Sequence, residues 1–203
     1  SATSWTEATA PADASMSIFF QIAARTSGLV AFGGTPTSGS STAAVGVLKS
    51  VDGGVTWTAV ASPLAGLPGA HIEASQNLAT LYVNKRSGSS APIFYRSIDG
   101  GANWTNPAGA TGAPGPIRIV GASADTALVG SFNTILRTTD GFANTTTVLT
   151  APASATVSAI EVAPSDSTVV YAVTQGLLVY KSANGGASFT LQSSIRTFID
   201  SQP

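Results

Sequence analysis

The sequence predicts an all-β protein, a β-propeller of four-stranded antiparallel blades, and two observations carry this prediction. A short turn motif occurs four times along the 203 residues, as Ser-x-Asp-Gly-Gly-x-x-Trp in two copies and as variants of it in the other two, and its third position falls at residues 52, 99, 140 and 184. Each repeat also contains short apolar runs rich in β-branched and aromatic residues, whereas no window supports a long amphipathic helix.

We expect each motif to form a hairpin turn between the last two strands of a blade. Asp-Gly and Asn-Gly tolerate positive φ, and the Asp or Asn side chain accepts hydrogen bonds from nearby backbone amides. The third copy departs from the others, because Phe142 replaces a glycine and Thr145 replaces the tryptophan. This predicts a distorted third turn, in which Phe142 supplies the missing aromatic ring. The residues assigned to the turn motif are Ser50, Asp52, Gly54, Trp57, Ser97, Asp99, Gly101, Trp104, Thr138, Asp140, Ser182, Asn184, Gly186 and Phe189.

Three strand-like runs precede each turn, and a fourth strand follows it. The first, innermost strands are predicted at 18–20, 72–74, 117–120 and 160–162. The second strands are predicted at 29–32, 80–83, 127–130 and 169–173. The third strands each end in a cation, and these cations are Lys49, Arg96, Arg137 and Lys181. Because they should lie on separate blades beside the turns, we expect a structural role rather than contacts with nucleic acid.

The whole chain is interpreted as one propeller domain, 1–203, with repeats at about 17–61, 70–107, 116–150 and 157–193. Residues 3–8 match a fourth strand and residues 195–203 match a first strand, so we expect one incomplete blade in addition to the four full ones. A fragment of a longer propeller, an engineered or proteolysed piece, and a blade completed by another chain are the three explanations, and the first is favoured.

The segments "YRSIDGGANWT" and "IEVAPSDSTVVYAV" carry a resemblance to a known family. The turn is similar to the Asp-box, or bacterial neuraminidase, repeat of sialidases, xyloglucanases and sortilin-type receptors. The resemblance implies a propeller whose ligands bind on the face opposite these turns, where the loops 35–42 and 84–91 are expected. It implies no catalytic residue, because the Arg-Ile-Pro signature of sialidases is absent and 118–120 reads Arg-Ile-Val.

Composition narrows the possible chemistry. Charged residues make up 9% of the chain, the net charge is −1, and there is one histidine and no cysteine. Zinc–thiolate sites, disulfides and thiol nucleophiles are therefore excluded, and no phosphate loop or calcium loop is present. We expect no cofactor, no metal, no nucleic-acid partner and no membrane insertion. A weakly charged chain rich in Ser and Thr is typical of extracellular proteins or of cell and virion surfaces.

One charge pattern suggests a site. The predicted innermost strands carry an Ile followed by a charge whose sign alternates from blade to blade, in Glu73, Arg118, Glu161 and Arg196. These side chains should gather at the central channel, where opposite charges on neighbouring blades could pair. Two interpretations stand, an inter-blade ring of salt bridges and a polar ligand site at the channel mouth. The other candidate ligand-binding residues are His71, Lys85 and Arg86.

Two function hypotheses follow. The first, which we favour, is a non-catalytic secreted or surface-exposed propeller that binds a protein or a glycan, or serves in a structural assembly. The second is a segment of an Asp-box glycoside hydrolase, similar to xyloglucanases or sialidases, whose catalytic residues lie partly outside this chain. The second rests on analogy of fold alone. In either case, another chain or further residues are expected to complete the propeller.

Overall fold

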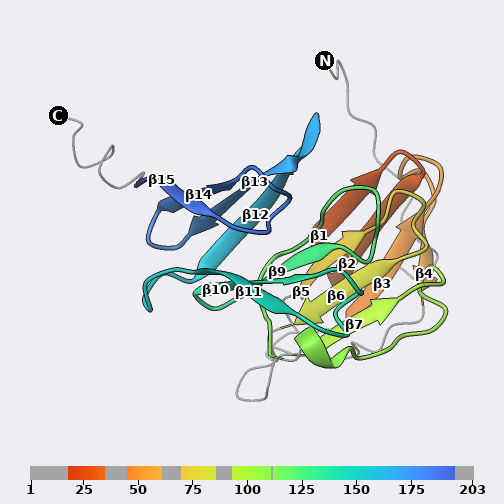
Figure 1. Cartoon of the computed structure of the whole chain (residues 1–203). Helices are drawn as coiled ribbons and strands as arrows, with labels where there is room; N and C mark the ends of the chain where they lie inside the picture. Colours follow the sequence, from red (N-terminus) through yellow and green to blue (C-terminus); the bar gives the residue numbers. More distant parts are fainter. Residues whose placement is uncertain (1–17, 35–44, 61–69, 86–92, 111, 195–203) are drawn as a thin grey trace.

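The computed structural model describes residues 18–34, 45–60, 70–85, 93–110 and 112–194, and these form four antiparallel sheets (Figure 1). The sheets are the blades of a β-propeller, and strand order within each follows the sequence. The innermost strands β1, β5, β8 and β12 contact one another in turn. The prediction of an all-β propeller is confirmed. In the described ranges the only helical element is a single 3₁₀ turn, η1 (Ala108–Ala110).

The strand bounds agree with the predicted order of four strands per repeat. Blade 1 contains β1 (Ile18–Arg25), β2 (Gly28–Gly34), β3 (Val45–Ser50) and β4 (Thr58–Val60). Blade 2 contains β5 (Ala70–Ala74), β6 (Leu81–Lys85) and β7 (Ile93–Ser97). Blade 3 contains β8 (Ile117–Ile119), β9 (Ala127–Ser131), β10 (Thr134–Thr138) and β11 (Thr146–Thr150). Blade 4 contains β12 (Val157–Ala163), β13 (Asp166–Thr174), β14 (Leu178–Ser182) and β15 (Thr190–Ser194).

Two details differ from the prediction. In blade 2 the fourth strand is reduced to one antiparallel bridge, Arg96 with Thr105. The first strand of blade 1 is also longer than predicted and extends to Arg25. The segments 3–8 and 195–203, assigned to an incomplete blade, lie outside the described residues.

The hydrophobic core is divided among the contacts between blades. Side chains alternate along each strand, so blades 2 and 3 each have one face toward the preceding blade and one toward the next. Between blades 1 and 2, for example, Val30 and Val47 of the first pack with Ile72, Leu81 and Val83 of the second, and all five are fully buried. Two similar clusters join blade 2 to blade 3 and blade 3 to blade 4. Blades are thus stabilised mainly by their neighbours.

The four acid–glycine turns have one hydrogen-bond pattern. In the first, the Ser50 hydroxyl donates to Asp52 Oδ1 at 2.8 Å, and the backbone N–H of Gly54 donates to Ser50 Oγ at 2.8 Å. The backbone N–H of Thr56 then donates to Asp52 Oδ1 at 2.9 Å, and the Trp57 indole N–H donates to the Gly54 carbonyl at 3.0 Å. In the fourth turn Asn184 takes the place of the acid and accepts the same backbone bond at 3.0 Å. The predicted local role of the motif is confirmed.

The third turn is not distorted, contrary to the prediction. The backbone N–H of Phe142 donates to Thr138 Oγ1 at 2.9 Å, and the Thr138 hydroxyl donates to Asp140 Oδ1 at 2.8 Å, as in the other copies. Phe142 adopts a φ of 69° and buries its ring against Tyr82 and Phe94, with centroids 5.4 Å and 4.8 Å away. Burial of a large aromatic ring offsets the cost of a left-handed backbone, which is about 1–2 kcal/mol.

Two of the four cations that precede the turns connect successive blades. Arg137 Nε donates to the carbonyl of Gly185 in the next turn at 3.1 Å. Arg96 pairs with Asp125 in blade 3 and lies 5.9 Å from the centroid of the Tyr82 ring. Lys181, in blade 4, instead lies over Tyr171 of its own blade, 5.7 Å from the ring centroid. The basic residue before the turn therefore has a structural role in blades 2, 3 and 4.

Candidate functional site

The inner strands of all four blades line a pocket of about 490 Å³. It lies where these strands run into the turns that follow them, at 74–76, 121–124 and 163–167. Its charged lining residues are Arg25, Glu73, Arg118 and Glu161. The pocket is therefore the place where the alternating charges of the sequence meet.

Strand register explains why these side chains converge. Glu73 pairs with Tyr82, Arg118 with Leu128, and Glu161 with Tyr171. Each charge thus occupies one equivalent position on the innermost strand of its blade. The same position in blade 1 is Ala23, which pairs with Val30.

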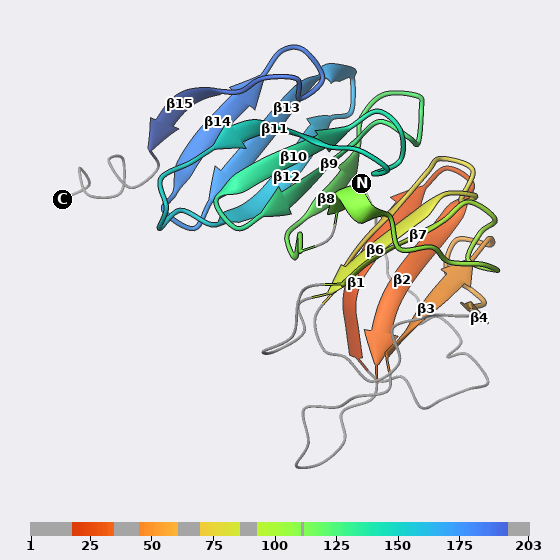
Figure 2. The same ribbon diagram turned by 60° about the horizontal axis from the view of Figure 1, so that its bottom comes forward.

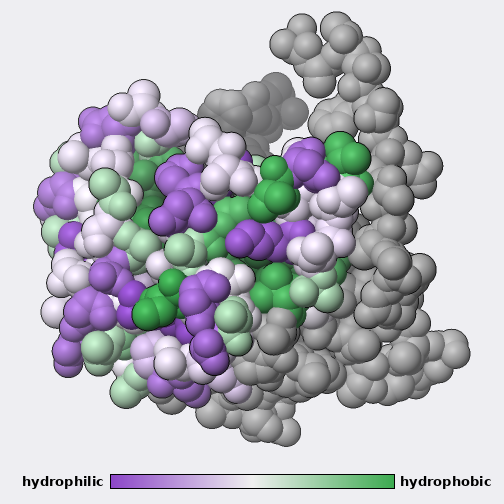
Figure 3. Space-filling view, turned by 90° about the vertical axis from the view of Figure 1, so that its right-hand side faces the viewer, coloured by the Kyte–Doolittle hydropathy of each residue, from purple (hydrophilic) through white to green (hydrophobic). Residues whose placement is uncertain are grey.

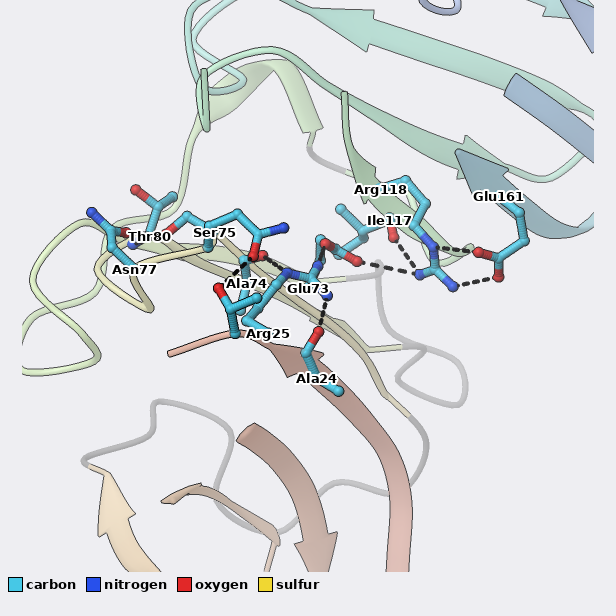
Figure 4. Close-up of polar contacts among 12 residues, drawn as sticks. Ala24, Arg25, Glu73, Ala74, Ser75, Asn77, Thr80, Ile117, Arg118 and Glu161 are labelled. Carbon is cyan, nitrogen blue, oxygen red and sulfur yellow. Dashed lines mark hydrogen bonds and ion pairs between the residues drawn. The ribbon is translucent and has the colours of Figure 1, made fainter. Parts of the chain in front are cut away.

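The charges form a continuous ladder of ion pairs (Figure 4). Arg118 donates from Nη2 and Nε to the two oxygens of Glu161, at 2.6 Å and 3.2 Å. Its Nη1 lies 3.4 Å from Glu73 Oε2 and donates to the carbonyl of Ile117 at 2.8 Å. The predicted pairing of Arg118 with both glutamates is confirmed.

Arg25 was not identified from the sequence, although it forms the first member of the ladder. Its Nη2 pairs with Glu73, and its Nε donates to the carbonyl of Ala74 at 2.7 Å. Arg25 lies two residues after Ala23 and therefore on the same side of β1. The correspondence of Ile22-Ala23 with Ile72-Glu73 is the signal that could have identified it, but the predicted strand, 18–20, covers only the first three residues of β1 and stops before Arg25.

The ladder is buried at Glu73 and open at Glu161. The Glu73 side chain is 4% exposed, whereas that of Glu161 is 65% exposed. A carboxylate buried to this degree requires charged partners to remain ionised, and Glu73 has two arginines. Each guanidinium nitrogen of Arg25 and of Arg118 already donates a hydrogen bond, so the geometry favours a structural ladder over a vacant anion site.

The remaining predicted ligand residues divide into two groups. His71 is half-buried on β5, and its backbone N–H donates to Asn84 Oδ1 at 3.2 Å. Burial lowers the pKa of His71, and the charge of Arg118 lowers it further, so the imidazole is neutral near pH 7. Lys85 ends β6, but its side chain lies outside the described part of the structure, as do Arg86 and Arg196. Most of the loop segments 35–42 and 84–91 also lie outside it.

Every carboxylate in the described ranges has a hydrogen-bond or ion-pair partner. Three hold acid–glycine turns, and their hydrogen bonds to neighbouring backbone and side-chain groups lower the pKa of Asp52, Asp99 and Asp140 to about 2. The others are bound by Arg25, Arg96, Arg118 or Thr168, and they are Glu73, Asp125, Glu161 and Asp166. Within these ranges no three His, Cys, Asp or Glu residues are grouped closely enough to hold a metal ion.

A second feature missed from the sequence is Phe132, in the tight turn between β9 and β10. Its φ is 52° and its side chain is 50% exposed. A left-handed backbone is uncommon for a bulky residue, and such conformations are concentrated at binding sites. The turn lies at the opposite end of β10 from the third acid–glycine turn.

On the side of the molecule in Figure 3, hydrophilic and hydrophobic residues are interspersed over the described part. Among the described residues we find no helical segment with the length and hydropathy that a bilayer crossing requires.

Comparison with known proteins identifies the fold and no closer relationship. No family model matches the chain, and no curated protein matches it. Among solved structures, a GH74 enzyme of Niastella koreensis is similar with a TM-score of 0.54 and 16% identity, over 87% of this chain and 38% of the enzyme. The GH74 xyloglucanase from Xanthomonas campestris is similar with a TM-score of 0.52 and 15% identity, over 84% of this chain and 37% of the enzyme. A chain of the COPII outer coat vertex has a TM-score of 0.53 and 11% identity, over 85% of this chain and 50% of its own.

This chain thus spans between about a third and a half of the length of these neighbours. The neighbours include both enzymes and a coat protein, so the shared fold does not select a function.

Proposed function

We propose that this chain is a non-catalytic β-propeller that acts as a binding or structural module, outside the cell or on the surface of a cell or virion. Its partner is a protein or a glycan. We also assign its four turns to the Asp-box class, because all four share two hydrogen bonds. The Ser or Thr hydroxyl donates to the Asp or Asn side chain two residues later. The same hydroxyl oxygen accepts from the backbone N–H four residues later.

The occupied carboxylates are the observation that carries the proposal. A glycosidase requires two carboxyl groups beside the sugar bond, one of them able to hold a proton near neutral pH. In the described ranges the carboxylates serve turns or ion pairs, and three have a pKa of about 2. The central pocket is likewise lined by charges that neutralise one another, which suits a scaffold.

Phe132 indicates where a partner would bind. It projects from the end of blade 3 opposite the acid–glycine turns, which is the face that the Asp-box resemblance implies for ligands. Loops on a rigid scaffold are the usual carriers of binding residues. An exposed aromatic ring offers contact area to a sugar or to a protein side chain.

Catalysis is tested by incubating the purified chain with xyloglucan and with sialosides. We expect no release of reducing ends or of free sialic acid. Turnover that is lost in Glu161→Gln would refute the non-catalytic assignment and support the alternative, a segment of a glycoside hydrolase.

Binding is tested on a glycan array and a displayed-peptide library, using the native chain and Phe132→Ser. We expect ligands selected by the native chain to lose affinity for Phe132→Ser by about tenfold, as for a central aromatic contact. Val51→Ser is the matched control, because Val51 is 72% exposed in an acid–glycine turn at the other end of the blades. Equal losses of affinity in both variants would contradict the assignment of the binding site to the face that carries Phe132.

A further inference from the structure

Among the described residues, each end blade exposes one large apolar side chain at a position that is fully buried in the other three blades. Three positions of the second strand, Val30, Tyr82 and Leu128, are fully buried by the next blade. The equivalent residue of blade 4 is Tyr171, which pairs with Lys181 as Tyr82 pairs with Arg96, and it is 41% exposed.

Blade 1 shows the complementary exposure. The first strands carry Ile72, Ile117 and Ile160 toward the preceding blade, and all three are fully buried. Their equivalent in blade 1 is Ile22, which pairs with Ala31 and is 50% exposed. Ala31 and Leu48 on the same face are already buried, so the open part of this face is its inner edge, around Ile22.

The ion-pair ladder also ends in opposite charges. Its order is Arg25, Glu73, Arg118 and Glu161, so one end is an arginine and the other is a glutamate. Glu73 has an arginine on each side, whereas Glu161 has only Arg118 among the described residues and is largely exposed. An arginine beyond blade 4 would continue the alternation; Arg196, which follows Glu161 in the sequence pattern, lies outside the described residues.

We propose that two copies of this chain associate head to tail, with the exposed surface around Tyr171 of blade 4 in each packed on the open inner edge of blade 1 in the other. The trailing face around Tyr171 then meets the leading face around Ile22, as in the three contacts within one copy. Glu161 of one copy approaches Arg25 of the other, and the ladder becomes a closed ring of alternating charge. Two sets of four blades give eight, within the usual range for propellers. A head-to-tail contact that closes on itself gives a discrete dimer rather than a filament.

Figure 2 shows the arrangement on which this rests, with the β12–β15 sheet and the β1–β4 sheet at opposite ends of the row of blades. A second copy suits these faces better than an unrelated partner, because each face already has its matching half on the same chain. The proposal is independent of the external ligand, since it concerns the blade contacts and not the Phe132 end.

The test is the molar mass of the full chain in solution, measured by light scattering and sedimentation over a concentration series. We expect a dimer that dissociates on dilution. Tyr171→Lys and Ile22→Lys should each raise the dimer Kd by about thirtyfold or more, as at an interface hot spot. Val51→Lys, on an exposed turn, should leave it unchanged. Circular dichroism and thermal unfolding establish that each variant is folded.

A mixture of the two variants distinguishes head-to-tail packing from other dimers. Tyr171→Lys and Ile22→Lys together retain one native contact, between Ile22 of the first chain and Tyr171 of the second. We therefore expect a one-to-one heterodimer in the mixture, at a total concentration at which each variant alone is mainly monomeric. A native chain that stays monomeric at high concentration, an open series of higher oligomers, or a dimer unaffected by Ile22→Lys would each overturn the proposal.

Discussion

Removing the carboxylate of Glu73 should destabilise the propeller far more than removing that of Glu161. Glu73 is 4% exposed and pairs with two arginines, which are themselves 19% and 22% exposed. Glu73→Ala leaves both guanidinium groups facing each other across the pocket without a counter-charge between them. Breaking a buried pair costs about 3–5 kcal/mol, and partial exposure of the arginines reduces this to about 2–4 kcal/mol. Glu161→Ala removes an exposed pair and should cost about 0.2–1 kcal/mol.

The assay is urea unfolding at 25 °C and pH 7, followed by circular dichroism. Both substitutions are made in the Ile22→Lys chain, so that association of copies does not affect Glu161 and no new charge is placed beside it. Adding 1 M NaCl should shrink the effect of Glu161→Ala and leave that of Glu73→Ala nearly unchanged, because salt screens exposed charges most. The reasoning fails if Glu161→Ala costs as much free energy as Glu73→Ala, or if Glu73→Ala costs less than about 1 kcal/mol.

Three further predictions concern the turns and the contacts between blades. Gly101→Ala should lower the free energy of unfolding by more than about 2 kcal/mol, because its new methyl group would overlap Val60 Cγ1. Gly53→Ala meets no atom within 4 Å and should cost only about 1 kcal/mol, for its φ of 75°. Comparable melting temperatures for the two variants would contradict this prediction. Stability should fall as the pH drops from about 4 toward 2, because the pKa of Asp52, Asp99 and Asp140 is about 2 in the folded chain and near 3.9 when unfolded, so the unfolded chain takes up protons first. Asp52→Asn should make this loss of stability with falling pH less steep and should change stability little at pH 7, because Asn184 fills the same role in the fourth turn. Urea unfolding at pH 7, 4 and 2.5 measures both effects. An unchanged dependence of stability on pH between 4 and 2.5 would argue against this role of Asp52. Tyr82→Phe removes the 2.7 Å hydrogen bond to the carbonyl of Ala124 in the next blade and should lower the free energy of unfolding by about 1 kcal/mol. An unchanged free energy of unfolding would show that this bond between blades adds no stability.

What the sequence by itself determined is the repeating blade. The hydrogen bonds of each acid–glycine turn join residues two to four positions apart, so a short motif specifies them completely. The alternation of strand residues is likewise local, and the pairing of Arg118 with Glu73 and Glu161 followed from one equivalent position in successive repeats. These features depend on spacing along the chain, which the sequence displays directly.

The tertiary structure decided the features that depend on distant residues. Phe142 keeps an undistorted turn because Tyr82 and Phe94, which precede it by 60 and 48 residues, enclose its ring. Arg25 enters the ladder because the length and register of β1 bring it to Glu73. The exposure of Ile22 and Tyr171 depends on which blade covers which face, and burial is a property of neighbours in space rather than of residue type. A repeat pattern shows that the blades are alike, but only their packing shows which face of each end blade is open.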